Sequence, residues 1–305
     1  MAAADGMALA LLGDMRAIAL LILPAVTAAC VSDDGTEDPL PPVVDSGAYR
    51  HFVQTGWTLP NGATEARWFG FDFDADGSID NSAGSVVGSL AAIGLDLGGA
   101  SATAFESGQL VTLHSVRADA LVDDGSVSWH VLSGARSSPP RFDGTDQFRV
   151  TGSDGELVGA IIGGRADLRW GVVGLAVPFF PDQPPLVMPI AEARIAADLD
   201  DDGCAGRIGG VIVTADIETT LLRLAAQAIV HIERNPTHEF AIAAHSIFDT
   251  NNDGRITVDE IAGSSIARSL LQPDVDLDHD NLRDGLSFGL GFDCVPATFR
   301  VIGEV

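Results

Sequence analysis

The chain has 305 residues, with 17 basic and 43 acidic side chains and a formal net charge of −26. A charge this negative repels nucleic acids and anionic membranes and attracts cations, so a nucleic-acid-binding protein is not expected. An apolar fraction of 46% is too high for a disordered chain, and the length allows one large domain or two smaller ones.

Residues 1–29 have the features of a targeting segment. Arg16 precedes an apolar run at residues 17–26, and small residues follow up to Ala29. A positive start, about ten apolar residues and small residues at a cleavage site are typical of signal peptides, and the run is too short to span a bilayer. Acidic residues before Met15 do not fit such a start, so we expect Met15 to be the true first residue.

Cys30 directly follows these small residues. The arrangement resembles the lipobox of bacterial lipoproteins, which implies cleavage before Cys30 and attachment of lipid to its sulfur. Thr27 departs from the family, which usually has Leu there, and an ordinary secretory cleavage near Ala29 is the alternative. In either case we expect an exported protein, in which the acidic, Pro-rich residues 30–47 act as a tether.

Residues 48–213 are predicted to form a β-domain. Short runs of β-type or alternating residues are separated by turn clusters, and they lie at residues 110–120, 126–132, 148–150 and 157–162. Many short strands at such spacing are typical of an antiparallel β-sandwich of the jelly-roll kind. We therefore expect a mainly β fold, in which this sandwich is followed by a short helical segment and a closing strand.

An acidic loop lies inside this β-domain, with carboxylates at positions 1, 3, 5 and 9: Asp72, Asp74, Asp76 and Asp80. With Gly77 at position 6, it resembles the calcium loops of dockerin and thrombospondin type 3 repeats. It departs from a complete EF-hand loop at position 12, which is Ala83. Four close carboxylates repel each other unless a cation lies among them, so we expect calcium here, and a solvated acidic turn is the alternative.

Residues 214–305 are predicted to be a helical segment that ends in a strand. A broad apolar face at residues 217–232 indicates a helix, which Asn235-Pro236 ends. Two further helical patterns, at residues 237–248 and 257–271, flank a polar loop. The last strand is expected within residues 286–302, where the chain returns to its sheet.

The polar loop at residues 249–260 closely resembles the twelve-residue EF-hand calcium loop. Gly254 at position 6 permits the sharp bend, and Glu260 at position 12 offers two oxygens to a cation. The resemblance implies that these residues hold calcium: Asp249, Asn251, Asp253, Arg255, Thr257 and Glu260. Arg255 would contribute only its backbone carbonyl. A polar turn without an ion is the alternative reading.

A similar acidic spacing recurs near the end of the chain, at Asp276, Asp278, Asp280 and Asp284. Asn281 replaces Gly at the bend, and Asn tolerates the left-handed backbone conformation better than most residues. We expect a further calcium site there. Residues 198–202 carry three more alternating Asp residues, but without a donor at position 9 or 12 a charged turn explains them equally well.

Two cysteines, Cys204 and Cys294, remain in the predicted mature chain. In an exported protein such a pair favours a disulfide, with two buried thiols as the alternative.

No catalytic motif is recognisable. From the targeting segment and the acidic loops, the sequence predicts an exported, lipid-anchored protein that binds calcium, and the ion is expected to have a structural role. This organisation also resembles Asp-rich lipoproteins of Gram-negative bacteria, a resemblance that implies no particular chemistry. Two alternatives stay open. A carbohydrate- or protein-binding module would show a row of exposed aromatic residues, drawn from Trp57, Trp68, Trp129 and Trp170. A secreted hydrolase would show a cleft with paired carboxylates.

Overall fold

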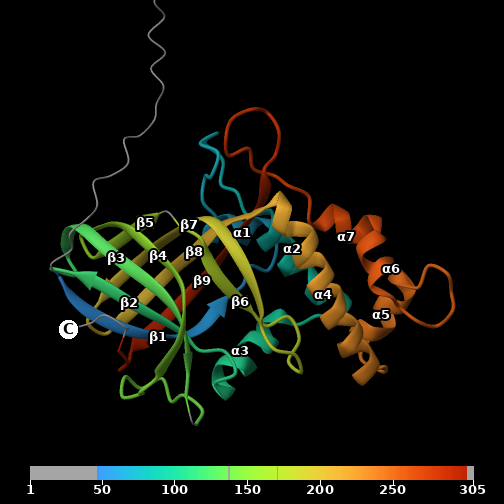
Figure 1. The fold of residues 1–305 in the computed structure, drawn as a ribbon, viewed down its shortest axis with the longest axis horizontal. Coiled ribbons are helices and arrows are strands. Elements are labelled where there is room, and N and C mark those ends of the chain that lie inside the picture. Colours follow the sequence, from blue (N-terminus) through green and yellow to red (C-terminus); the bar gives the residue numbers. More distant parts are fainter. Residues whose placement is uncertain (1–46, 137, 170, 301–305) are drawn as a thin grey trace, which may run out of the picture. The chain divides into compact units, whose positions relative to one another are not determined.

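The computed structural model describes residues 47–136, 138–169 and 171–300, and these residues contain nine strands in one antiparallel sheet (Figure 1). The predicted signal segment, Met15, Cys30 and all but the last residue of the predicted tether lie outside the described residues. The strands are β1 (Ala48–Thr58), β2 (Thr112–Ala118), β3 (Asp123–Ala135), β4 (Arg149–Ile162), β5 (Arg165–Arg169), β6 (Val173–Val177), β7 (Leu186–Asp200), β8 (Gly203–Val213) and β9 (Gly285–Pro296).

The sheet closes on itself as a barrel of eight strands. Its order is β5-β4-β3-β2-β1-β9-β8-β7-β6, and β5 also pairs with β7, from Arg165 opposite Asp198 to Arg169 opposite Arg194. The strand β6 stays outside the closed ring and pairs only with β7. The predicted jelly-roll sandwich is therefore wrong. Apolar and polar residues alternate in the same way along the strands of a sandwich and of a barrel, and only the β5–β7 pairing separates the two folds.

The barrel interior is filled by side chains from alternate positions of its strands. The large ones that are almost fully buried include Phe52, Trp129, Leu157, Ile195 and Phe292. Glycine is required where strands approach closely: a Cβ on Gly206 would lie 2.5 Å from the Cβ of Ala197. The interior is thus a packed core.

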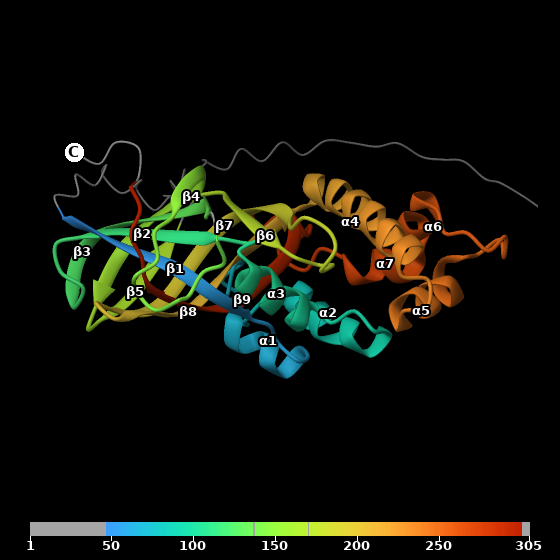
Figure 2. The ribbon, with the colours of Figure 1, turned by 90° about the horizontal axis from the view of Figure 1, so that it is seen from below.

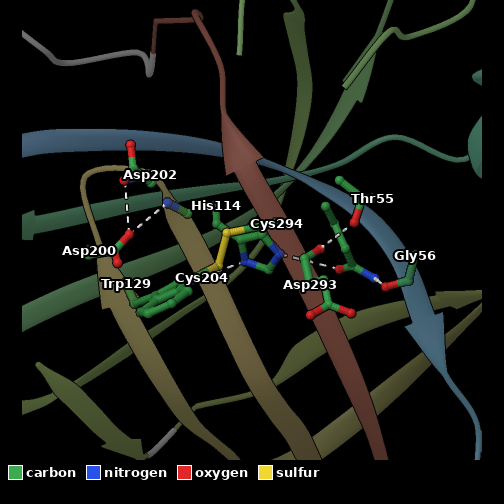
Figure 3. The surroundings of a disulfide bond; sticks show 11 residues. Thr55, Gly56, His114, Trp129, Asp200, Asp202, Cys204, Asp293 and Cys294 are labelled. Carbon is green, nitrogen blue, oxygen red and sulfur yellow. Dashed lines mark hydrogen bonds between the residues drawn. A yellow bond between two sulfur atoms is a disulfide. The ribbon is translucent and has the colours of Figure 1, made fainter. Parts of the chain in front are cut away.

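One chain of polar groups crosses this core (Figure 3). The indole Nε1–H of Trp129 donates to His114 Nδ1 at 3.0 Å, and His114 Nε2 lies 3.3 Å from Gln54 Oε1. The Gln54 amide in turn donates to the carbonyl of Gly56 at 3.1 Å, at a bulge in β1. Because Nδ1 accepts, His114 is neutral with its proton on Nε2, and complete burial lowers its pKa from 6.5 to about 3.

The disulfide between Cys204 and Cys294 lies beside this polar chain (Figure 3). The two residues face each other in the register of β8 and β9, with their Cα atoms 4.9 Å apart. The pair that the sequence analysis favoured is thus the one that the structure contains. The bond joins the last strand of the sheet to a strand 90 residues earlier.

Two groups of helices lie towards one end of the barrel (Figure 2). The first comprises α1 (Ala63–Phe69), α2 (Ser82–Leu90), the 3-10 turn η1 (Ala91–Ile93) and α3 (Leu97–Ser107). These helices interrupt the region predicted to be entirely β. They are short, and α2 consists largely of Ser, Gly, Ala and Val, so no apolar stripe marked it as a helix in the sequence.

The second group comprises α4 (Thr214–Arg234), α5 (Glu239–Phe248), α6 (Val258–Gly263) and α7 (Ser265–Leu270). The helices expected at residues 217–232 and 237–248 are present as α4 and α5. The expected helix at 257–271 is divided in two, because Ser264 adopts an extended backbone and caps α7. No helix in the described part of the chain is long and apolar enough to cross a membrane.

Candidate metal centres

The three loops predicted to hold calcium share one backbone conformation. In each loop the residues at positions 4 and 6 have a positive φ, which only Gly, Asn and few other residues adopt readily. The φ angles are 57° and 88° at Ala75 and Gly77, 56° and 81° at Asn252 and Gly254, and 59° and 69° at His279 and Asn281. The same turn is therefore built three times from different residues.

The hydrogen bonds within the three loops also match. The side chain at position 1 accepts the backbone N–H of position 6, at 3.0 Å for Asp72, 3.0 Å for Asp249 and 2.8 Å for Asp276. The side chain at position 3 accepts the N–H of position 5, and the side chain at position 5 accepts the N–H of position 7. These bonds hold three oxygen-bearing side chains over a single turn of backbone.

Loops 72–80 and 276–284 are closed by the carboxylate at position 9. Asp80 accepts the N–H of Phe73 at 2.8 Å, and Asp284 accepts the N–H of Leu277 at 2.6 Å. As a result, each loop brings three carboxylates together with oxygens within 4.8 Å of one another: Asp72, Asp74 and Asp80, and Asp276, Asp278 and Asp284. Calcium–oxygen distances of about 2.3–2.6 Å put ligands on opposite sides of an ion roughly this far apart. The predicted ligands Asp76 and Asp280 lie in the same loops but outside the two triads.

The 72–80 loop concentrates negative charge around a partly buried carboxylate. Burial raises the pKa of Asp80 to about 6, and the nearby carboxylates Asp74, Asp274 and Asp76 raise it further against a hydrogen bond from Phe73. In addition, Asp72 Oδ1 is buried and has no hydrogen-bond partner. A buried oxygen without a donor and a carboxylate with a raised pKa both fit a site that takes a cation.

A basic side chain fixes the same loop to the barrel wall. Arg194 on β7 donates to the carbonyl of Asp72 at 2.7 Å and stacks over the ring of Phe73 at 5.0 Å. Its guanidinium hydrogen-bonds to the carbonyl of Asp72, whereas the Asp72 carboxylate accepts the N–H of Gly77 within the loop. Nothing in the alternating strand pattern of β7 marks Arg194 as part of a binding site.

The 72–80 and 276–284 loops lie side by side although about 200 residues separate them (Figure 1). Phe71, Phe73 and Val275 pack together against the outer face of β7 and β8. Hydrogen bonds also join the residue Ser82, which follows the 72–80 loop, to Ser287 and Asp274, which lie on either side of the 276–284 loop. Ser82 N–H donates to Ser287 Oγ at 2.8 Å, and Ser287 Oγ donates to Asp274 Oδ2 at 2.6 Å.

The EF-hand-like loop differs from the other two at its closing residue. The Glu260 carboxylate accepts the N–H and the hydroxyl of Thr257, both at 2.9 Å, and so forms the capping box of α6. These bonds, the backbone one first, lower the pKa of Glu260. The carboxylate does not join Asp249 and Asp253 in a triad of the kind formed in the other loops. Ile256 at position 8 is buried in the adjoining core.

The Asp-rich residues 198–202 comprise the end of β7 and the two-residue turn that leads to β8. Asp200 accepts the backbone N–H groups of Asp202 and Gly203 at 2.9 and 3.0 Å (Figure 3). This arrangement is that of a hairpin turn stabilised by its own side chain.

The four tryptophans do not form an exposed row in the described residues. Trp129 is buried inside the barrel, and Trp57 is half-buried, with its ring 6.1 Å from that of Phe105. Trp68 is exposed, whereas Trp170 lies outside the described residues.

Comparisons with known proteins leave the geometry of these loops as the basis for assigning a function. No protein-family model matches the chain, and neither the curated proteins nor the solved structures contain a significant match.

Proposed function

We propose that this chain is an exported calcium-binding protein in which the ion is structural. The observation that carries the proposal is the identical turn found in three loops, each with oxygen-bearing side chains at positions 1, 3 and 5. Three unrelated surface turns have no reason to share both left-handed positions and the same hydrogen bonds. A common ligand for all three accounts for the repetition.

The donors favour calcium over other cations. Carboxylate and backbone oxygens suit a hard cation, and the described residues place no His or Cys within either acidic triad. Calcium accepts six to eight oxygens in flexible geometry, whereas magnesium requires a nearly ideal octahedron. In this proposal Asp72, Asp74 and Asp80 hold one ion, and Asp276, Asp278 and Asp284 hold a second.

The EF-hand-like loop holds a third ion in this proposal. Asp249, Asn251, Asp253 and the Arg255 carbonyl would provide oxygens, and Glu260 would complete the set by turning from Thr257 towards the ion. The loop joins α5 to α6, and both helices bury apolar residues in the main core. An ion there would hold the two helices at a fixed angle, as a structural clamp.

Export and lipid anchoring through Cys30 remain part of the proposal. A disulfide between Cys204 and Cys294 is typical of an oxidising compartment outside the cytoplasm. Calcium outside a cell is abundant and steady, which suits a site that stabilises and does not signal. Calcium is the ligand, and the net charge of −26 disfavours a nucleic acid as partner.

Calorimetry and melting curves test the proposal. Calcium titrated into the protein should occupy at least two sites, with dissociation constants of about 10⁻⁴ to 10⁻³ M, as in extracellular modules. A site with a constant of about 0.1 mM gains RT ln 11, roughly 1.4 kcal/mol, at about 1 mM calcium. Glu260→Ala should remove one binding event and leave the others, and Asp202→Asn in the hairpin turn is the control that should change none.

A hydrophobic dye separates a structural ion from a sensor. In a calcium sensor the EF-hand opens and exposes an apolar groove, so dye binding increases with calcium. Here we expect calcium to raise the melting temperature while dye binding stays constant. An increase in dye binding that Glu260→Ala abolishes would refute the structural role, and the absence of any calcium heat would refute the proposal as a whole.

A further inference from the structure

An apolar cavity of about 290 Å³ lies among the helices, next to the EF-hand-like loop, whose flanking residues Phe248 and Ile261 line it. Its lining comes from α2, η1, α4, α5, α6 and α7, and from Leu95, Phe180 and Leu271 outside these elements. All nineteen lining residues are Ala, Val, Leu, Ile or Phe. No side chain that lines it can donate or accept a hydrogen bond.

The cavity reaches inward from the surface and is not a flat apolar face. Ten of its lining residues are buried, among them Phe180, Ala228 and Phe240, and the rest are half-buried with one exception. The exception is Ile266 on α7, which is 48% exposed and marks the mouth. A partner protein would bury a broad exposed surface, whereas most of this lining is already buried or half-buried, which suits a small apolar ligand.

The chemistry of the walls determines what such a ligand can be. Water needs two to four polar partners in a buried site, and the side chains of these walls provide none, so the cavity is a poor site for water. An empty cavity is destabilising in proportion to its volume. An engineered apolar cavity of about half this size takes up small apolar molecules such as benzene.

We propose that this cavity binds a single hydrocarbon chain of about ten carbons, supplied by a one-chain amphiphile free in solution. At roughly 30 Å³ per methylene, close to the volume of a water molecule in the liquid, 290 Å³ holds about ten methylene groups. The polar head of the amphiphile stays in solvent beside Ile266. The net charge of −26 disfavours an anionic head, so the head is neutral or cationic.

A series of linear alcohols with six to fourteen carbons tests the proposal by calorimetry on the mature chain. Binding should tighten about four-fold per methylene up to about ten carbons and then level off, because longer chains extend into solvent. Ala228→Leu adds three carbons to the cavity wall, so the levelling should occur about three carbons earlier. A dependence on chain length that continues unchanged to fourteen carbons would overturn the proposal.

Mouth variants keep the proposal testable if Ala228→Leu fails to fold. Ile266→Glu should weaken binding of decanol at least ten-fold, because the ligand must pass a charged group. The matched control is Ile242→Glu on α5, which is 62% exposed but does not line the cavity, and it should bind decanol as the unmodified protein does. Equal affinities for the two variants would refute the assignment.

Two further measurements distinguish a free amphiphile from a membrane or a protein partner. Phosphatidylcholine vesicles should not sediment with the mature, non-lipidated chain, and the chain should stay monomeric in analytical ultracentrifugation. Vesicle binding or dimerisation that Ile266→Glu abolishes would show that the opening serves a membrane or a second copy, and would overturn the proposal.

Discussion

Acid should destabilise the barrel through one buried imidazole. The unfolded chain binds a proton at His114 with a pKa near 6.5, whereas burial keeps the folded residue neutral until about pH 3. Below pH 6.5 the unfolded state therefore holds more protons than the folded state, and the free energy of unfolding decreases as pH decreases. The loss approaches 1.4 kcal/mol per pH unit and ends near pH 3.

The magnitude at a practical pH is about 2.5 kcal/mol. Between pH 7 and pH 4.5 a group with pKa values of 6.5 unfolded and about 3 folded changes the free energy of unfolding by this amount. At pH 4.5 the result hardly depends on the folded pKa, because the folded imidazole stays almost fully neutral. The many carboxylates also titrate in this range, so a matched variant is required.

His114→Gln provides that variant, because an amide can accept from Trp129 and donate to Gln54 but does not titrate. Urea unfolding of both proteins at pH 7 and at pH 4.5, in the same calcium-containing buffer, gives two differences in free energy. The unmodified protein should lose about 2.5 kcal/mol more than the variant. Equal losses would show that the imidazole is hydrated or protonated in the folded state, and would refute the reasoning.

Three other predictions concern the buried ion pair between Asp146 and Arg136, the disulfide and the 72–80 site. Asp146 is almost fully buried and accepts hydrogen bonds from Arg136 and from two backbone N–H groups. Asp146→Ala should therefore lower the free energy of unfolding in urea by about 3–5 kcal/mol. The control is Asp143→Ala at an exposed carboxylate of the same loop, which should leave the melting temperature nearly unchanged. Replacing both Cys204 and Cys294 by Ala should cost about 4–5 kcal/mol for a 90-residue loop, and an unchanged unfolding midpoint would contradict this. Burial raises the pKa of Asp80, so its ionised form destabilises the folded protein at pH 7.5 when no cation is bound. Asp80→Asn should therefore raise the melting temperature at pH 7.5 in a buffer with a chelator, and should reduce the increase in melting temperature that calcium causes. A lower melting temperature of the variant both with the chelator and with calcium would contradict this reasoning.

The acidic loops could be located from sequence because their chemistry is local. Positions 1, 3, 5 and 6 of a turn lie within six residues, so spacing alone identifies Asp72, Gly77 and Asp249 as parts of one kind of loop. The pairing of Cys204 with Cys294 could be predicted for another reason, because the chain has only three cysteines and Cys30 has another expected role. That the 72–80 and 276–284 loops lie side by side could not be predicted from the sequence, because it depends on how the sheet closes.

Closure of the sheet could not be predicted for a physical reason. Alternation shows which side of a strand is buried but not which strands pair, and the β5–β7 contact joins Arg165–Arg169 to a segment about 30 residues later. Burial of His114 was hidden for a similar reason. β2 is buried on both faces, and its buried polar residues Thr112, His114 and Ser115 are distributed over both, so its sequence does not show on which side the histidine lies.

The position of β9 determines when the barrel can form during synthesis. This strand is the last in the described chain, yet it lies between the first strand, β1, and β8. Until residues 285–296 emerge, β1 and β8 are two open edges, and the core lacks Phe292 and its neighbours. The chain therefore cannot complete its fold from the N-terminus onward, and its final step joins segments more than 200 residues apart, which is slow by the usual dependence of folding rate on contact separation. A chain released before that strand is made exposes two unpaired strands that invite pairing with other chains.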